Sequence, residues 1–147
     1  MYSNKQNGVV YSGERTMNPN QLALLIAAPQ EGEPAMHNDM TAMTQALLDR
    51  GLSADRILSL HGRLDRTLVL ACLRTVRRRI TLWENGSLFI HVSGDGFFIG
   101  DTSETARAGL LFDESNDVTD DGHLFWDNFF AALNLPTGIR LILLPDL

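Results

Sequence analysis

The chain has 147 residues, of which 44% are hydrophobic and 20% are charged, and its mean hydropathy is −0.05. This length suits one domain, and no apolar run approaches the ~18 residues of a membrane span. Eighteen acidic against twelve basic side chains give a net charge of −6, which argues against nucleic-acid partners because phosphate contacts need a basic surface. Residues 1–21 lack the apolar middle of an export signal, so we expect a cytoplasmic protein with no membrane partner.

The first part of the chain predicts an arm followed by a buried strand. Residues 1–20 are polar and show no periodicity, which predicts a flexible N-terminal arm before a single domain over residues 21–147. Leu22–Ala28 is a continuous apolar run ended by Pro29, the pattern of a central strand buried on both faces. We expect Asn38 or Asp39 to cap the next helix. The helix then presents four apolar residues on one face and ends at a glycine: Met40, Met43, Leu47, Leu48 and Gly51.

A second strand, a longer helix and a third strand follow. The strands are predicted at Ile57–Leu60 and Ser87–Val92, and the helix begins at Thr67 and is stopped by Asn85-Gly86. Its inward stripe is expected to contain Val69, Leu73, Val76, Ile80 and Trp83. Strands that alternate with helices favour a parallel sheet, so the fold class is α/β.

The longer helix also carries the chain's single cysteine and its densest basic cluster. Cys72 lies among apolar residues and is expected to be a buried structural thiol. The basic cluster is Arg74 with Arg77, Arg78 and Arg79. A solvated helix face is its ordinary explanation, and a docking patch is the alternative.

The remainder of the chain predicts a loop or hairpin from Phe97, a short strand at Leu110–Phe112 and an acidic loop. A last buried strand is predicted at Ile139–Leu144. The helix before that strand is expected to contain Leu124, Phe125, Phe129, Ala132 and Leu133. The four histidines, His37, His61, His91 and His123, fall in separate elements, so a histidine metal cluster is not expected.

The stretch Leu88–Gly96 is the strongest functional signal. An apolar strand leads into a small-residue turn that presents Asp95 where open α/β sheets place their chemistry. One possibility is a hydrolase in which Asp95 and Asp146 share a proton, although no other feature suggests that chemistry.

The order of elements from Leu22 to Leu147 resembles the large-subunit-like part of caspases and metacaspases. The matching segments are Leu24–Ile26, Asn38-Asp39, Leu88–Gly96, the acidic loop Asp113–Asp121 and Ile139–Asp146. This resemblance implies a three-layer caspase-like sandwich, with a mostly parallel central sheet flanked by helices.

The resemblance also implies that the catalytic dyad is missing. The family has Ser-Gly-His-Gly where this chain has Ser93-Gly94-Asp95-Gly96, so Asp95 occupies the position of the catalytic histidine. The nucleophilic cysteine of the family would follow Leu147. A carboxylate with a reference pKa near 3.9 is a poor base for a thiol, and no catalytic residue is therefore assigned.

Two acidic features match binding positions of the family. Asp39, Ser93 and Asp146 match the residues that line a pocket for an Arg or Lys side chain, although a helix cap and a turn residue would also explain Asp39 and Ser93. The second feature matches a calcium site, against the alternative of a merely solvated loop, and consists of Asp113, Asp120 and Asp121. No other cofactor is expected.

These observations predict a catalytically inactive caspase-like protein that acts as a binding, regulatory or scaffolding subunit. A protein partner or a second copy is expected to bind it, through a sheet edge in the case of the second copy. The alternative is a truncated or processed large-subunit fragment of a cysteine endopeptidase whose nucleophile lies beyond this chain.

Overall fold

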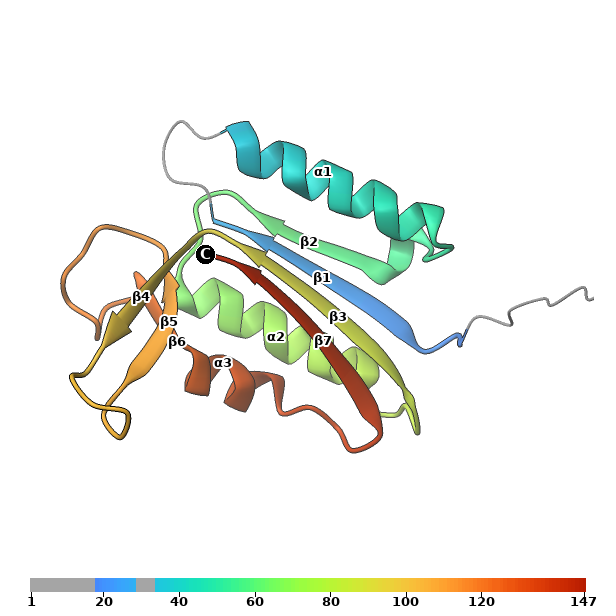
Figure 1. The fold of residues 1–147 in the computed structure, drawn as a ribbon. Coiled ribbons are helices and arrows are strands. Elements are labelled where there is room, and N and C mark those ends of the chain that lie inside the picture. Colours follow the sequence, from blue (N-terminus) through green and yellow to red (C-terminus); the bar gives the residue numbers. More distant parts are fainter. Residues whose placement is uncertain (1–17, 29–33) are drawn as a thin grey trace, which may run out of the picture.

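A four-stranded parallel sheet with strand order β2-β1-β3-β7 forms the centre of the computed structural model, which describes residues 18–28 and 34–147 (Figure 1). The strands are β1 Gln21–Ala27, β2 Ile57–His61, β3 Gly86–Ser93 and β7 Ile139–Asp146. A second, antiparallel sheet has the order β4-β5-β6, with β4 Asp95–Ile99, β5 Arg107–Leu111 and β6 His123–Phe125. The α/β class expected from the sequence is therefore confirmed.

Helices cover both faces of the parallel sheet. Helix α1 (Pro34–Asp49) lies on one face, and α2 (Arg66–Ile80) and α3 (Trp126–Leu133) lie on the other (Figure 1). A short 3₁₀ helix, Ala54–Arg56, precedes β2. No helix among the described residues is both long and apolar enough to cross a membrane.

The predicted first strand is confirmed at the centre of this arrangement. Residues 22–27 of β1 are at most 2% exposed, because β1 is paired on both sides and covered on both faces. Leu24 and Ile26 belong to the core between the sheet and the helices α2 and α3, whereas Leu25 and Ala27 pack with Met40 of α1. Successive side chains of a strand point to opposite faces, so one apolar run supplies both cores.

Local signals explain the ends of α1 and α2. The side chain of Asp65 accepts a hydrogen bond from the Leu68 N–H at 2.7 Å and caps α2, which begins at Arg66, one residue before the predicted start. Gly51 has a φ of 91° and follows α1, where the Leu52 N–H donates to the Leu47 carbonyl at 3.1 Å. This is the glycine-terminated helix end that the sequence predicted.

The inward stripe of α2 is also confirmed. Its four helical members are fully buried, and Trp83, which follows the helix, packs against the same core. The helix ends at Ile80, before the predicted stop at Asn85, because the Trp83 N–H turns back to the Ile80 carbonyl at 3.1 Å.

Several sequence-based expectations about local structure are wrong. Helix α1 begins at Pro34, so Asn38 and Asp39 lie within the helix and do not cap it; proline suits a first helical position because its missing N–H needs no partner there. Leu48 is exposed and does not belong to the inward face. Leu124 and Phe125 lie in β6, before α3, because cross-strand pairing of Leu124 with Leu110 holds them extended.

The small antiparallel sheet contains the hairpin that the sequence offered as one of two possibilities after Gly96. Strands β4 and β5 pair directly, with Phe97 opposite Gly109. A Cβ at Gly109 would meet the Leu124 carbonyl and the Phe97 ring, so this position requires glycine.

Part of the predicted N-terminal arm belongs to the folded unit. The side chain of Asn20 donates to the Asn85 carbonyl at 2.9 Å, and the Ser87 N–H donates to the Asn20 carbonyl at 2.9 Å. The rest of the arm, residues 1–17, lies outside the described residues, as does Pro29.

Truncation of the core at α2 should lower stability far more than the same truncation at the surface. Leu73 is 0% exposed, and Leu82 just beyond α2 is 90% exposed. We expect Leu73→Ala to lower the free energy of unfolding by about 2–5 kcal/mol and Leu82→Ala to change it by less than about 0.5 kcal/mol. Urea unfolding of both variants measures the difference, and equal losses would contradict the assignment of this core.

Candidate binding site at the carboxyl ends of the strands

The carboxyl ends of the four parallel strands form one edge of the sheet. The register pairs Ala27 with His61 on one side and with Ser93 on the other, and it pairs Ser93 with Asp146. These four residues therefore form a row across the sheet. Ser93 is 3% exposed, whereas the carboxylate of Asp146 at the open end of the row is in contact with solvent.

Backbone hydrogen bonds extend the sheet past the ends of these strands. The Ala28 N–H donates to the Ser93 carbonyl at 3.0 Å, and the Gly94 N–H donates to the Asp146 carbonyl at 3.1 Å. A Cβ on Gly94 would lie 3.4 Å from the Ala28 carbonyl oxygen, so the chains pass closely here. These backbone hydrogen bonds thus fix the positions of Ser93 and Asp146 at the edge of the sheet.

Asp95 does not lie in a turn. It is the first residue of β4, where it is paired in register with Leu111, and Gly94 alone separates it from β3. Asp95 is partly buried and takes part in an interaction within the protein. The expectation that a small-residue turn presents Asp95 is wrong, because the backbone after Gly94 continues directly into the second sheet.

The structure brings together two of the three residues of the predicted pocket. Ser93 and Asp146 are neighbours, but no hydrogen bond or ion pair of the described residues joins Asp39 to either of them. The ring of His37 in α1 lies 5.5 Å from the ring of His61, which fixes the side of α1 that faces this edge. Asp39 is two residues further on, about 200° around the helix, and it is exposed.

The histidines are less separate than the sequence suggested. His37 and His61 are in ring contact, although they belong to different elements. His91 in β3 is 6% exposed, and its Nδ1 lies 3.1 Å from the Leu144 carbonyl oxygen of β7. Its Nε2 is buried and has no hydrogen-bond partner in the described part of the chain. Side-chain as well as backbone contacts therefore join β3 to β7.

In the acidic loop, the possible metal ligands that lie close together differ from those that the sequence suggested. Possible ligand atoms of Asp113, Asp120 and His123 lie within 4.8 Å of one another. Asp121 instead forms an ion pair with Arg66 at the start of α2, with Nη2 and Oδ1 3.1 Å apart. The sequence interpretation missed His123, whose position three residues after Asp120 and just before an apolar strand was its only signal.

The loop carboxylates are held by groups of the loop itself. Asp113 accepts a hydrogen bond from the Ser115 N–H at 2.9 Å, and Asp120 accepts one from the Gly122 N–H at 2.9 Å. Nδ1 of His123 lies 3.1 Å from Oδ1 of Asp120. Hydrogen bonds from the side chains of Ser115 and His123 lower the pKa of Asp120. A hydrogen bond from the hydroxyl of Thr119 likewise lowers the pKa of Asp117.

The donor set of this loop does not fit the calcium site that the sequence suggested. Calcium takes 6–8 oxygen ligands, whereas Asp113, Asp120 and His123 offer two carboxylates and one imidazole nitrogen. Asp121, the third carboxylate of the sequence-based set, is occupied by Arg66. We therefore assign no chemistry of this protein to a bound calcium ion.

No protein-family model matches the sequence, and no curated protein matches it either.

The titration of Asp120 tests the geometry of the acidic loop. Because the pKa is lowered in the folded protein, the contribution of Asp120 to stability is complete above its ordinary value of 3.8 and is lost as the pH falls through the lowered pKa. We expect the carboxyl carbon of Asp120 to titrate below pH 3.8 in an NMR experiment. Removal of the hydroxyl in Ser115→Ala should move the midpoint upward.

Ser103→Ala, which changes an exposed serine in the β4–β5 hairpin, is the matched control and should leave the Asp120 midpoint unchanged. A wild-type midpoint at or above 3.8 would show that the acidic loop is not held as described.

Proposed function

We propose that the protein is a catalytically inactive caspase- or metacaspase-like protein that acts as a binding, regulatory or scaffolding subunit. The proposal is supported by the parallel sheet with helices on both faces, and by the string Ser93-Gly94-Asp95-Gly96 at the carboxyl end of β3. In the caspase-like clan this position holds the base of a cysteine peptidase. Here it holds a carboxylate that belongs to β4.

The one thiol of this chain is poorly placed for catalysis, which is consistent with the proposal. Cys72 is the single cysteine of the chain, and it lies in the middle of α2, where it packs against the core. Burial raises the pKa of its thiol, which lowers the fraction of reactive thiolate at neutral pH. A carboxylate at Asp95 could not activate a thiol efficiently, since its ordinary pKa is several units below that of a thiol.

The observation that carries the binding role is the β3–β7 register. It places the buried Ser93 beside Asp146, whose carboxylate faces solvent at the sheet edge. A carboxylate there can pair with the side chain of Arg or Lys, and the hydrogen bond from the Gly94 N–H to the Asp146 carbonyl fixes the backbone that carries it. Asp39 is not part of this proposed cation pocket, because it faces solvent on α1.

The outer side of β7 supports association with another chain. In the described residues no strand pairs with that side, and β7 is eight residues long. Ile142 is 38% and Leu144 is 45% exposed; both lie on the same face as α1, at the β7 end of the sheet. An extended apolar edge of this kind is a template for a further strand, so we propose a protein partner or a second copy at β7.

Binding of a basic peptide without cleavage tests the proposed pocket. We expect a labelled arginine-containing peptide to bind and to remain intact by mass spectrometry, and Asp146→Ala to weaken binding by about tenfold because a charge-assisted contact is lost. Asp101→Ala, which removes an exposed carboxylate from the β4–β5 hairpin, is the control and should bind normally.

Unchanged affinity in Asp146→Ala would refute the pocket. Cleavage of the peptide that is lost in Asp95→Ala would refute the proposal that the protein is inactive.

Disruption of the β7 edge tests the proposed association. We expect wild-type protein, or wild-type protein with its partner, to elute as an assembly, and Ile142→Lys to shift it to the monomer mass because a charge is placed on the apolar edge. Light scattering coupled to size-exclusion chromatography measures the masses. Leu82→Lys alters an exposed leucine outside the sheet and should not change them; a wild-type monomer that captures no protein would contradict the proposed edge.

A further inference from the structure

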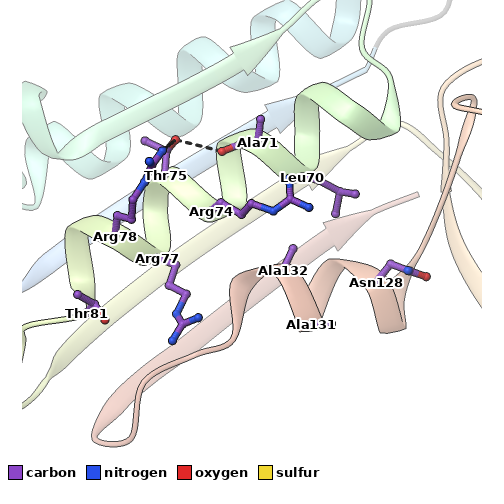
Figure 2. Close-up of a pocket in the computed structure, with 10 residues that line it drawn as sticks. All are labelled: Leu70, Ala71, Arg74, Thr75, Arg77, Arg78, Thr81, Asn128, Ala131 and Ala132. Atoms are coloured by element: carbon purple, nitrogen blue, oxygen red, sulfur yellow. Dashed lines mark hydrogen bonds between the residues drawn. The ribbon is translucent and has the colours of Figure 1, made fainter.

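A groove of about 820 Å³ lies between α2 and α3 on the side of these helices that faces away from the sheet (Figure 2). The buried residues of α2 face the sheet, whereas most of the groove-lining residues of α2 are exposed. Small or aliphatic side chains from both helices form part of its lining: Leu70, Ala71, Ala131 and Ala132. The groove therefore offers apolar contact area outside the core.

Three arginines of α2 also line the groove. Arg74, Arg77 and Arg78 are spaced by three and four residues, which places them on neighbouring positions of one helical surface. Figure 2 shows Arg74 extending toward α3 and Arg77 extending into the space beside the loop after α3. Positive charge is thus concentrated along one side of the groove.

None of these three guanidinium groups is paired with a carboxylate of the described residues. Arg74 has no hydrogen-bond partner there, and Nη2 of Arg78 donates to the hydroxyl of Thr75 at 3.2 Å. The two Nη atoms of Arg77 face Asn134, whose amide oxygen accepts from them at 2.6 and 3.1 Å in the amide orientation that satisfies both groups. Neutral acceptors leave the three charges uncompensated.

The protein as a whole has a net charge of −6. Among the described arginines, Arg66 pairs with Asp121, and Arg107 lies 3.6 Å from the carboxylate of Asp127. The groove arginines are distinguished by lying together, three along one helical surface without a carboxylate between them. Like charges on adjacent helix positions repel one another, so the groove arginines favour an external anion. Their planar guanidinium groups match carboxylates in a paired, two-hydrogen-bond geometry.

The rest of the surface restricts the size and kind of that anion. A long nucleic acid or polyphosphate would carry phosphates beyond the groove onto a protein of net negative charge, which disfavours it. A short segment that alternates carboxylates with small aliphatic side chains would fit both the arginines and the apolar lining. We propose that the groove between α2 and α3 binds an acidic peptide segment of a partner protein.

This inference goes beyond the proposed function, because the groove lies on the helical layer and includes no residue of the carboxyl-end site. The test uses full-length protein and a fluorescein-labelled peptide of three Glu-Leu-Ala-Glu repeats, followed by fluorescence anisotropy. Its uncharged match is the peptide of three Gln-Leu-Ala-Gln repeats. We expect the acidic peptide to bind at least about tenfold more tightly than the uncharged one.

The variant Arg74→Gln/Arg77→Gln should bind the acidic peptide at least about tenfold more weakly. Arg50→Gln removes an exposed arginine just after α1 and is the matched control, which should bind like wild type. Asp146→Ala should also bind the acidic peptide normally, so a failure of the carboxyl-end pocket and a failure of the groove are distinguishable. Melting curves confirm that each variant is folded.

Three results would overturn the inference: equal binding of the charged and uncharged peptides, equal binding by the groove variant and Arg50→Gln, or tighter binding of polyphosphate or of a short RNA than of the acidic peptide. Self-association that disappears in the groove variant would also overturn it, because a second copy would then occupy the groove.

Discussion

Burial of β1 on both faces is the constraint on which the rest of the structure depends. Its residues 22–27 can be withdrawn from water only if strands lie on both sides and helices lie above and below. That requirement places β2 and β3 next to β1, α1 on one face, and α2 and α3 on the other. The layers of the fold therefore follow from a single apolar run, and coverage of both faces is the usual setting of a parallel sheet.

The same constraint positions the candidate binding edge. Because β1, β3 and β7 are parallel and in fixed register, their carboxyl ends stop in one row, and Ser93 comes to lie beside Asp146. The binding role that we propose requires only that the carboxylate of Asp146 be accessible at this edge. Peptide cleavage would instead require a base and a thiol that are aligned and activated.

The sequence predicted the parts of the fold that rest on long apolar periodicity. The continuous apolar run predicted that β1 is buried on both faces, and the structure confirms it. The spacing of Val69, Leu73, Val76 and Ile80 predicted the buried side of α2, which is also confirmed. Positions decided by short-range competition were predicted less well. Leu124 and Phe125 fit a helical pattern, but pairing with β5 holds them extended. Pro34 begins α1 earlier than the polar residues Asn38 and Asp39 suggested.

The site was predictable to the extent that it follows from the sheet. Ser93 and Asp146 end strands, so strand pairing alone brings them together. The position of Asp39 depends on the rotation of α1 about its axis, which no local pattern encodes, and this residue faces solvent. The position of His123 depends on the path of the acidic loop. It lies beside Asp113 and Asp120 because β6 begins at that residue. The groove between α2 and α3 is likewise a tertiary feature, since its two sides are more than forty residues apart in the sequence.

The single residue between β3 and β4 has a mechanical consequence. Gly94 joins the parallel sheet to the antiparallel sheet, and its N–H is bonded to the Asp146 carbonyl. Rotation of the small sheet about this junction therefore changes the backbone torsions of Gly94 and strains that hydrogen bond. The two sheets are torsionally coupled, and strain applied at the β4–β5 hairpin is transmitted to the last residues of β7.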